Sequence, residues 1–271
     1  LAYLADRGRL ADFINLQTFF PLRAEFHDYL AWAANRVSMP VDYGNEITEV
    51  DWVDGAFAVR TATGETVRAA NLALGGGLRA KLPAGVEGSR RVFHNHHLID
   101  SLAALGPLRH GRVVVVGAGQ SAAEVAAHLH SVTDAQVHAV FSKYGYTPAD
   151  DSPYANRIFD AEAVDDFFGA SPQWRERIMS YHRSTNYSAV DPELIADLYR
   201  REYTETVSGL RRFHVHRASE VVDVRDTDDA VTVRIADGLS GKNTELVCDA
   251  VVFATGFEPT SVADLLGRLG A

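Results

Sequence analysis

Hydrophobic residues in the first part of the chain change their spacing after Gly44. Over residues 21–37 they recur every three or four positions, which predicts an amphipathic helix, and Pro21 suits its first turn. After Gly44 hydrophobic and polar residues alternate, and Asp-Gly and Thr-Gly pairs interrupt the alternation. This period of two predicts three consecutive strands, at residues 46–53, 56–61 and 65–75.

The same pattern returns near the end of the chain. Three alternating stretches again follow one another, at residues 219–226, 230–236 and 244–255. In both groups the last stretch becomes continuously apolar and runs into glycine, at Gly75 and at Gly256. We interpret this as an internal repeat of a three-stranded meander.

A different pattern separates the two meanders. Residues 112–116 are an arginine and four valines, which is typical of a strand buried in a parallel sheet. Residues 142–160 are polar and contain proline and glycine, so we expect a long functional loop there. The remaining predicted elements are a helix over 121–129, a strand over 136–141 and a helix capped by Asp191 that runs from Pro192 to about Val207.

The predicted strand and helix flank a glycine-rich turn, Gly117-Ala118-Gly119-Gln120-Ser121-Ala122. In a dinucleotide-binding unit the first glycine allows a tight turn, the second lets the backbone approach a pyrophosphate, and the third small residue permits helix–strand packing. The free N–H groups of the helix then face the phosphates. The competing interpretation is a glycine turn that binds no ligand.

The end of the second predicted strand indicates which nucleotide is bound. NAD-binding units usually place an acidic residue there to hold the ribose hydroxyls. This chain has Ser142-Lys143-Tyr144 instead, which offers a cation and no carboxylate. We therefore expect NADPH rather than NADH, with Lys143 near the 2′-phosphate. The alternative is that Lys143 is simply solvated.

The repeat also predicts a second glycine-rich unit in the whole protein. The second meander follows the glycine-rich unit, so by symmetry the first should follow a unit of its own. Residues 1–44 contain no such motif. We therefore expect the chain to be a piece whose missing upstream part holds a first glycine motif.

Composition excludes several classes of function. The 271 residues carry a formal net charge of -10, which argues against a surface for nucleic acids. No apolar run is long enough for a membrane span, so we expect no membrane partner. The single cysteine, Cys248, cannot form an intrachain disulfide, which favours the reducing cytoplasm.

Two further motifs in the chain suggest other chemistries, a metal site and a serine hydrolase. The histidine cluster at residues 94–97 lacks cysteine and helical spacing, so we expect a polar loop and no metal site. Residues 119–123 (GQSAA) resemble the turn that carries a hydrolase serine, and His182, His214 or His216 would then act as base. This serine hydrolase alternative explains neither Gly117 nor the repeat.

Several stretches together resemble the flavin-dependent N-hydroxylating monooxygenases, most closely the ornithine N-monooxygenases of siderophore and peptide biosynthesis. These stretches are residues 19–34, 71–77, 113–124, 150–160, 184–195 and 249–259. The resemblance implies an α/β flavoprotein with two dinucleotide-binding domains, in which a Rossmann-like NADPH domain is inserted into an FAD domain that here lacks its N-terminal βαβ unit. The implied domains are residues 1–107 (part of the FAD domain), 108–248 (NADPH domain with substrate loops) and 249–271 (return to the FAD domain).

The resemblance also implies an activity: NADPH reduces FAD, the reduced cofactor reacts with O2, and oxygen passes to the side-chain amine of L-ornithine. N-hydroxylation of lysine or a diamine, and an inactive fragment that only binds NADPH, are the alternatives. No residue is assigned as catalytic, and the family implies a homo-oligomer, a tetramer. The implied site residues are Gly117, Gly119, Gln120 and Ser121 at the pyrophosphate, Lys143 at the 2′-phosphate, Arg23 at the nucleotide, and Asn156, Asn186 and Ser188 at the substrate.

Overall fold

The structure is a computed structural model that describes residues 1–18, 20–182, 189–227 and 229–267. It has two compact units: unit 1 comprises residues 1–76 and 261–271, and unit 2 comprises residues 77–260. The domain boundaries predicted at 107/108 and 248/249 both fall within unit 2, because strands on either side of each boundary hydrogen-bond in one sheet. The assignment of cofactors to those domains stays a prediction.

Unit 1 contains short helices and the first meander. Its elements are α1 (Ala2–Asp6), α2 (Leu10–Asn15), α3 (Arg23–Ala34), β1 (Ile47–Val53), β2 (Ala56–Thr61), β3 (Thr66–Ala69) and α10 (Ala263–Leu266). The three strands form an antiparallel sheet in the order β1-β2-β3, as predicted. The third strand is shorter than predicted. It ends at Ala69, which pairs with Phe57 near the start of β2.

Helix α3 starts later than the apolar spacing predicted. Leu22 is its N-cap and Arg23 its first residue, so Pro21 precedes the helix instead of lying in its first turn. Its apolar side is largely uncovered in this chain, with Phe26 and Leu30 each 50% exposed. Helix α1 is attached to it by Tyr3, whose hydroxyl donates to the Asp28 carboxylate at 2.6 Å.

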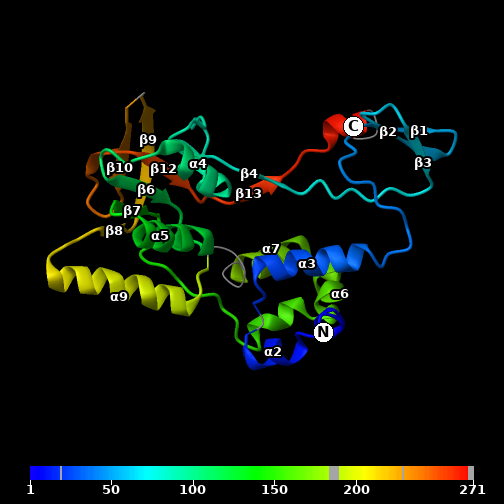
Figure 1. The fold of residues 1–271 in the computed structure, drawn as a ribbon, viewed down its shortest axis with the longest axis horizontal. Helices are drawn as coiled ribbons and strands as arrows, with labels where there is room; N and C mark the ends of the chain where they lie inside the picture. The colour runs from blue at the N-terminus through cyan, green and yellow to red at the C-terminus, as the bar shows by residue number, and fades with distance from the viewer. Residues whose placement is uncertain (19, 183–188, 228, 268–271) are drawn as a thin grey trace. The chain divides into compact units, whose positions relative to one another are not determined.

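Unit 2 is built around a parallel sheet of five strands in the order β5-β12-β6-β7-β8 (Figure 1). Its strands are β4 (Leu78–Ala80), β5 (Val92–His94), β6 (Arg112–Val116), β7 (Gln136–Val140), β8 (Phe213–His216), β9 (Ser219–Asp226), β10 (Val231–Asp237), β11 (Asn243–Cys248), β12 (Ala250–Phe253) and β13 (Phe257–Pro259). Its helices are η1 (Asn95–His97), α4 (Leu98–Leu105), α5 (Gln120–Val132), η2 (Ala155–Phe159), α6 (Ala161–Gly169), α7 (Pro172–Tyr181) and α9 (Pro192–Ser208). None of the helices in the described ranges is long and apolar enough to cross a membrane.

The central sheet confirms the predicted α/β fold and the buried valine strand. Strands β6, β7 and β8 are successive neighbours, and α5 is the crossover between β6 and β7. Strand β12 joins on the other side of β6, in register from Ala250 opposite Val113 to Phe253 opposite Val116. This is the strand order of one half of a Rossmann-type sheet.

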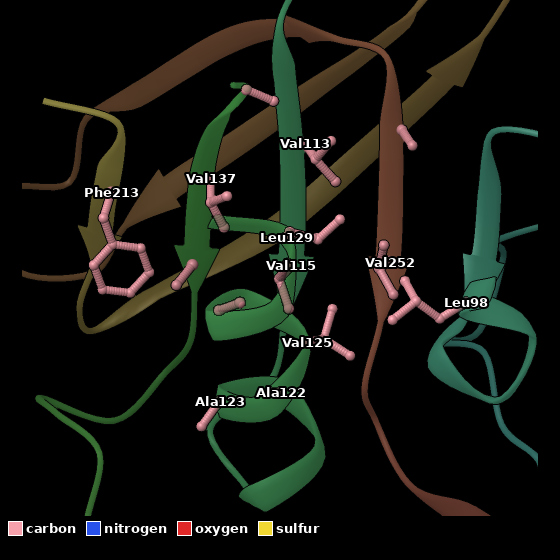
Figure 2. Close-up of a cluster of buried hydrophobic side chains, with 14 of the residues drawn as sticks. Leu98, Val113, Val115, Ala122, Ala123, Val125, Leu129, Val137, Phe213 and Val252 are labelled. Carbon is pink, nitrogen blue, oxygen red and sulfur yellow. The ribbon is translucent and has the colours of Figure 1, made fainter. Parts of the chain in front are cut away.

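Each face of the sheet is covered by a different layer. Helix α5 covers one face, where its Ala122, Val125 and Leu129 are buried in one cluster with valines of β6 and β7 (Figure 2). The second meander covers the other face, where Val231, Val233 and Ile235 of β10 are buried. Helix α5 and the meander thus fix the sheet between two apolar layers, which leaves its carboxyl edge as the place for polar chemistry.

The last strand of the second meander is two strands, and the single strand predicted over residues 244–255 is wrong. Strand β11 pairs with β10 in the meander, and β12 pairs with β5 and β6 in the central sheet. The chain changes sheets at Asp249, which is buried. Its carboxylate accepts hydrogen bonds from the N–H groups of His110 at 2.9 Å and Arg112 at 3.1 Å. A continuous apolar run cannot show that the partner strand changes within it.

Glu205 near the end of α9 anchors the start of β8. Its carboxylate accepts hydrogen bonds from the N–H groups of Arg212 and Phe213, at 2.8 and 2.7 Å. The same carboxylate lies 2.6 Å from Nε2 of His130 on α5. The position of β8 beside β7 therefore depends on contacts with both helices.

Candidate functional site

The glycine-rich turn lies at the carboxyl edge of the parallel sheet, where β6 passes into α5. The chain continues from β6 toward β7 and β8 on one side, while β12 and β5 lie on the other. In open α/β sheets, ligands bind in the crevice at such a change of direction. The structure therefore puts the sequence motif where a dinucleotide site is expected.

Gly117 is required by its surroundings. Its φ is +139°, and a Cβ on it would lie 2.5 Å from the carbonyl oxygen of Ala254, which follows β12. Its N–H donates to the carbonyl of Val140 at 3.0 Å, so the turn is held against the end of β7. Ala122, the third small residue of the motif, is fully buried, and a Cβ on Gly117 would come within 3.2 Å of it. Gly117 and Ala122 therefore have the small size that a dinucleotide-binding unit needs for its tight turn and its helix–strand packing.

The start of α5 is open to an anion. Gly119 is the N-cap in extended conformation and supplies no side-chain acceptor for the first-turn N–H groups. Ser121 follows in the first turn and is exposed. The free N–H groups and the positive end of the helix dipole suit a phosphate.

The Gln120 side chain has a structural partner that the sequence did not reveal. Its Nε2 donates to the carboxylates of Asp191 at 2.7 Å and Glu124 at 2.9 Å, and its Oε1 accepts the Asp191 N–H at 2.8 Å. Asp191 is the N-cap of α9, but its side chain makes no capping bond, contrary to the prediction. Gln120 therefore joins the beginnings of α5 and α9, and its backbone N–H is the group left to face a phosphate. Only the fold shows this contact between residues 71 positions apart.

Lys143 follows β7 by three residues and is half-buried. Its Nζ donates to Oγ1 of Thr147 at 3.1 Å. It lies at the end of the strand beside β6, which is where a Rossmann unit meets the ribose of its nucleotide. Lys143 thus lies beyond the end of the second strand of the unit, and its contact with a 2′-phosphate stays a prediction.

The predicted loop 142–160 contains one short helix, η2, and a cleft of about 380 Å³. Pro153, Tyr154, Asn156, Arg157 and Asp160 line this cleft. The Asn156 side-chain amide donates to the carbonyl of Asp151 at 2.9 Å.

Three further residues were predicted at the substrate or the nucleotide. Asn186 and Ser188 lie outside the described residues. Arg23 is the exposed first residue of α3 in unit 1.

The histidine cluster at residues 94–97 is not a plain polar loop. His94 ends β5, is buried, and makes a 2.8 Å hydrogen bond through Nε2 with the carbonyl of Gly256. Burial lowers the pKa of His94 below its ordinary value. Within the described ranges, no group of three His, Cys, Asp or Glu side chains could hold a metal ion.

The serine hydrolase alternative requires a histidine that hydrogen-bonds Ser121 as its base. His214 and His216 lie on β8 beside His138 of β7, with the His138 and His214 rings stacked at 4.5 Å. His182 caps the end of α7. Within the part of the chain that the structure describes, none of His182, His214 and His216 hydrogen-bonds Ser121.

Comparisons with known proteins point to one family. A family model described as L-lysine 6-monooxygenase/L-ornithine 5-monooxygenase matches residues 1–259. An L-ornithine N(5)-monooxygenase of Pseudomonas aeruginosa is 34% identical over 273 residues, which cover 94% of this chain and 61% of that protein.

Solved structures agree with this match. An ornithine N-hydroxylase of Kutzneria sp. 744, with reduced FAD, NADP+ and L-ornithine, has a TM-score of 0.92 at 40% identity and covers 99% of this chain and 66% of its own. An L-lysine 6-monooxygenase of Pseudomonas syringae has a TM-score of 0.81 at 31% identity, with coverage of 97% and 65%. The chain spans slightly less than two thirds of the length of these relatives.

Proposed function

The chain belongs to the L-lysine 6-monooxygenase/L-ornithine 5-monooxygenase family, and from this premise we propose that it serves the FAD- and NADPH-dependent N-hydroxylation of L-ornithine by O2. The observation that carries the proposal is the glycine-rich turn at the sheet's change of direction, where Gly117 leaves no room for a side chain. The ornithine substrate is favoured over lysine because the Kutzneria ornithine enzyme is 40% identical and the Pseudomonas syringae lysine enzyme 31% identical.

The described residues fit NADPH. Gly117 allows close approach of the backbone to the pyrophosphate, and the first-turn N–H groups of α5, from Gln120 and Ser121 onward, face its charge. Lys143 at the end of β7 supplies a cation for the 2′-phosphate. Arg23 of α3 is proposed to reach the nucleotide on the family resemblance. FAD, when bound, accepts the hydride and activates O2, so the protein's task is to position the partners.

The cleft beside η2 has the chemistry to hold an amino acid. The Asn156 amide group is fixed by the carbonyl of Asp151, and its Oδ1 accepts no hydrogen bond from the described residues. Arg157 and Asp160, 3.5 Å apart, offer one charge of each sign in the same cleft. A zwitterion presents a carboxylate and an ammonium, and amide and ionic groups of this kind can bind both. Asn186 and Ser188 are proposed as further contacts on the family resemblance.

The side-chain amine must lose its proton before it can attack oxygen. Its ordinary pKa of about 10.4 makes this cost roughly 4 kcal/mol near pH 7. No general base is assigned, so we propose that desolvation and proximity in the closed site supply this free energy.

The proposal is tested by hydroxylamine formation. The complete protein that contains these residues, supplied with FAD, NADPH and O2, should hydroxylate L-ornithine in preference to L-lysine and diamines. Asn156→Ala should raise the half-saturating ornithine concentration about tenfold, because one hydrogen bond to a charged group is lost. The control Asn243→Ala removes an exposed amide at the start of β11 and should leave saturation unchanged. NADPH binding without hydroxylamine would favour the nucleotide-binding alternative, and an unchanged curve for Asn156→Ala would reject its substrate role.

We also propose a setting for the reaction. An N-hydroxylated ornithine becomes, on acylation, a bidentate oxygen ligand for iron, which fits siderophore or peptide biosynthesis in the cytoplasm. A homo-oligomer, a tetramer on the family resemblance, is supported by the exposed apolar side chains of Val164 and Phe168 on α6 and Trp174 on α7. Sedimentation analysis of the purified chain tests the assembly.

A further inference from the structure

Two cationic residues come together where β7 and β8 end. Lys143 follows β7, and Arg217 is the residue directly after β8. The Ala218 N–H donates to the Lys143 carbonyl at 2.8 Å, and the Ser219 N–H donates to the Phe141 carbonyl at 2.9 Å. These bonds continue the pairing of the two strands, so the segments that carry the cations run side by side.

The Arg217 side chain rests on an aromatic ring. Its guanidinium carbon lies 5.2 Å from the centroid of the Tyr144 ring, and both side chains are exposed. Among the described residues, no carboxylate lies within ion-pair distance of Arg217. By contrast, Arg225 and Arg234 on the neighbouring meander both have carboxylate partners. The Tyr144 ring therefore orients a guanidinium whose charge is not neutralised by the protein.

The backbone next to Arg217 is held in an uncommon conformation. Ala218 has a φ of +48°, in the left-handed region that non-glycine residues seldom adopt. Its N–H bonds Lys143, and its carbonyl accepts the Gly238 N–H at 2.9 Å, so the turn is fixed from both sides. Strain of this kind is maintained most often at functional sites.

We propose that Arg217 is a specificity-determining residue that binds the 2′-phosphate of NADPH together with Lys143, with Tyr144 as the platform for its guanidinium. The inference rests on the proposed function, because it takes the nucleotide to lie across the glycine-rich turn. In a Rossmann unit the pyrophosphate lies at the first strand and the ribose at the end of the second. Here those strands are β6 and β7, and β8 is the next strand, about 4.8 Å further along the sheet.

The chemistry of the phosphate fits this pair of residues. A ribose 2′-phosphate is a compact, doubly charged anion with three acceptor oxygens, which one ammonium does not satisfy. Arginine adds two parallel N–H donors in a planar fork that matches phosphate oxygens, and stacking on Tyr144 leaves the edge of that fork free. An NADH molecule has only a hydroxyl at this point and gains little from Arg217.

Two fragments of the nucleotides provide the test. Adenosine 2′,5′-bisphosphate carries the 2′-phosphate, and adenosine 5′-monophosphate lacks it. Binding of each to the purified chain is measured by calorimetry for the wild type, Arg217→Gln, Tyr144→Phe and Tyr144→Leu. The matched control is Arg225→Gln, an exposed arginine on β9.

Arg217→Gln should weaken the bisphosphate about tenfold or more and change the monophosphate by less than about twofold, since a charged hydrogen bond is lost only for the former. Tyr144→Leu should weaken the bisphosphate about two- to fivefold, whereas Tyr144→Phe, which keeps the ring, should bind as the wild type does. Arg225→Gln should match the wild type for both ligands. The unchanged monophosphate affinity serves as the check that each variant is folded.

Two other outcomes separate this inference from the proposed function. A wild type that prefers the bisphosphate, with the preference retained in Arg217→Gln, overturns the role of Arg217 and leaves the NADPH assignment intact. A wild type that binds both fragments equally overturns the NADPH preference and Arg217 with it.

Discussion

At Gly117 the main chain passes so close to the Ala254 carbonyl that one added carbon atom decides the geometry of the turn. A Cβ would stand 2.5 Å from that oxygen, and the φ of +139° is one that side chains disfavour. Because β6 and β12 are fixed by their ladder, neither backbone can move aside cheaply. The same closeness that excludes a side chain would let the backbone of the turn approach the pyrophosphate of the proposed nucleotide.

Gly117→Ala should therefore lower the free energy of unfolding by about 2–4 kcal/mol, from backbone strain and overpacking together. Urea denaturation followed by circular dichroism measures the change. Gly169→Ala is the matched control, because a Cβ at Gly169 meets nothing within 4 Å. Equal stability of the two variants would contradict the steric account of the motif.

At the scale of the element, β7 and β8 share a row of three histidines on one face. His138 of β7 stacks on His214, and its Nδ1 lies 3.0 Å from Nε2 of His216. Burial, with smaller contributions from the charges of His214 and His216, lowers the pKa of His138 to about 3 from its ordinary value of 6.5. Burial also lowers the pKa values of His214 and His216. Burial therefore favours the neutral form of each histidine in the folded protein.

This row predicts a loss of stability in mild acid. Below pH 6.5 the unfolded chain binds a proton at His138, whereas the folded chain does so only near pH 3, so the free energy of unfolding falls as pH falls from about 6.5 toward about 3. One such histidine contributes about 1.4 kcal/mol per pH unit. His138→Gln should reduce the slope of unfolding free energy against pH by about this amount, between pH 4.5 and 6.5.

The control for this slope is His128→Gln, which replaces an exposed histidine on α5. Its slope is the reference against which the slope of His138→Gln is compared. The comparison uses slopes rather than absolute stabilities, because His138→Gln also removes packing and a hydrogen bond. A slope that is identical in both variants would show that the row does not titrate as described.

At the scale of the molecule, the two units differ in how much apolar surface they bury. The two hydrophobic clusters of the described residues both lie in unit 2, on opposite faces of its sheet. In unit 1, the buried apolar side chains among the described residues are Tyr3, Leu4 and Val50. Local stability follows the number of buried apolar contacts, so the units should open at different free energies.

Native-state hydrogen exchange measures this difference. The central strands of the two meanders form a matched pair, because β2 and β10 each pair with two antiparallel neighbours. We expect amides of β10 to exchange more slowly than those of β2 by on the order of a hundredfold. Similar protection of both strands would mean that unit 1 is stabilised by more than its own core.

Much of the fold could be predicted from local patterns. The valine run predicted a buried strand, the alternating stretches predicted both meanders, and Gly117, Gly119 and Ala122 predicted a dinucleotide turn. These features can be recognised within a short window of sequence, because the period of a strand or helix and the position of a glycine depend only on neighbouring residues. The family resemblance rested on six short stretches, including residues 150–160 and 184–195, and membership of the family is now shown.

The tertiary structure alone decided where distant segments meet. The change of sheets at Asp249, the bond between Gln120 and Asp191, and the stacking of Arg217 on Tyr144 join residues whose sequence spacing carries no period. Each contact depends on which strands become neighbours in the sheet. The strand order is the one that buries the apolar side chains on both faces of the central sheet. The sequence by itself determined a glycine-rich turn between a buried strand and a helix, and the order of the strands determined which side chains surround it.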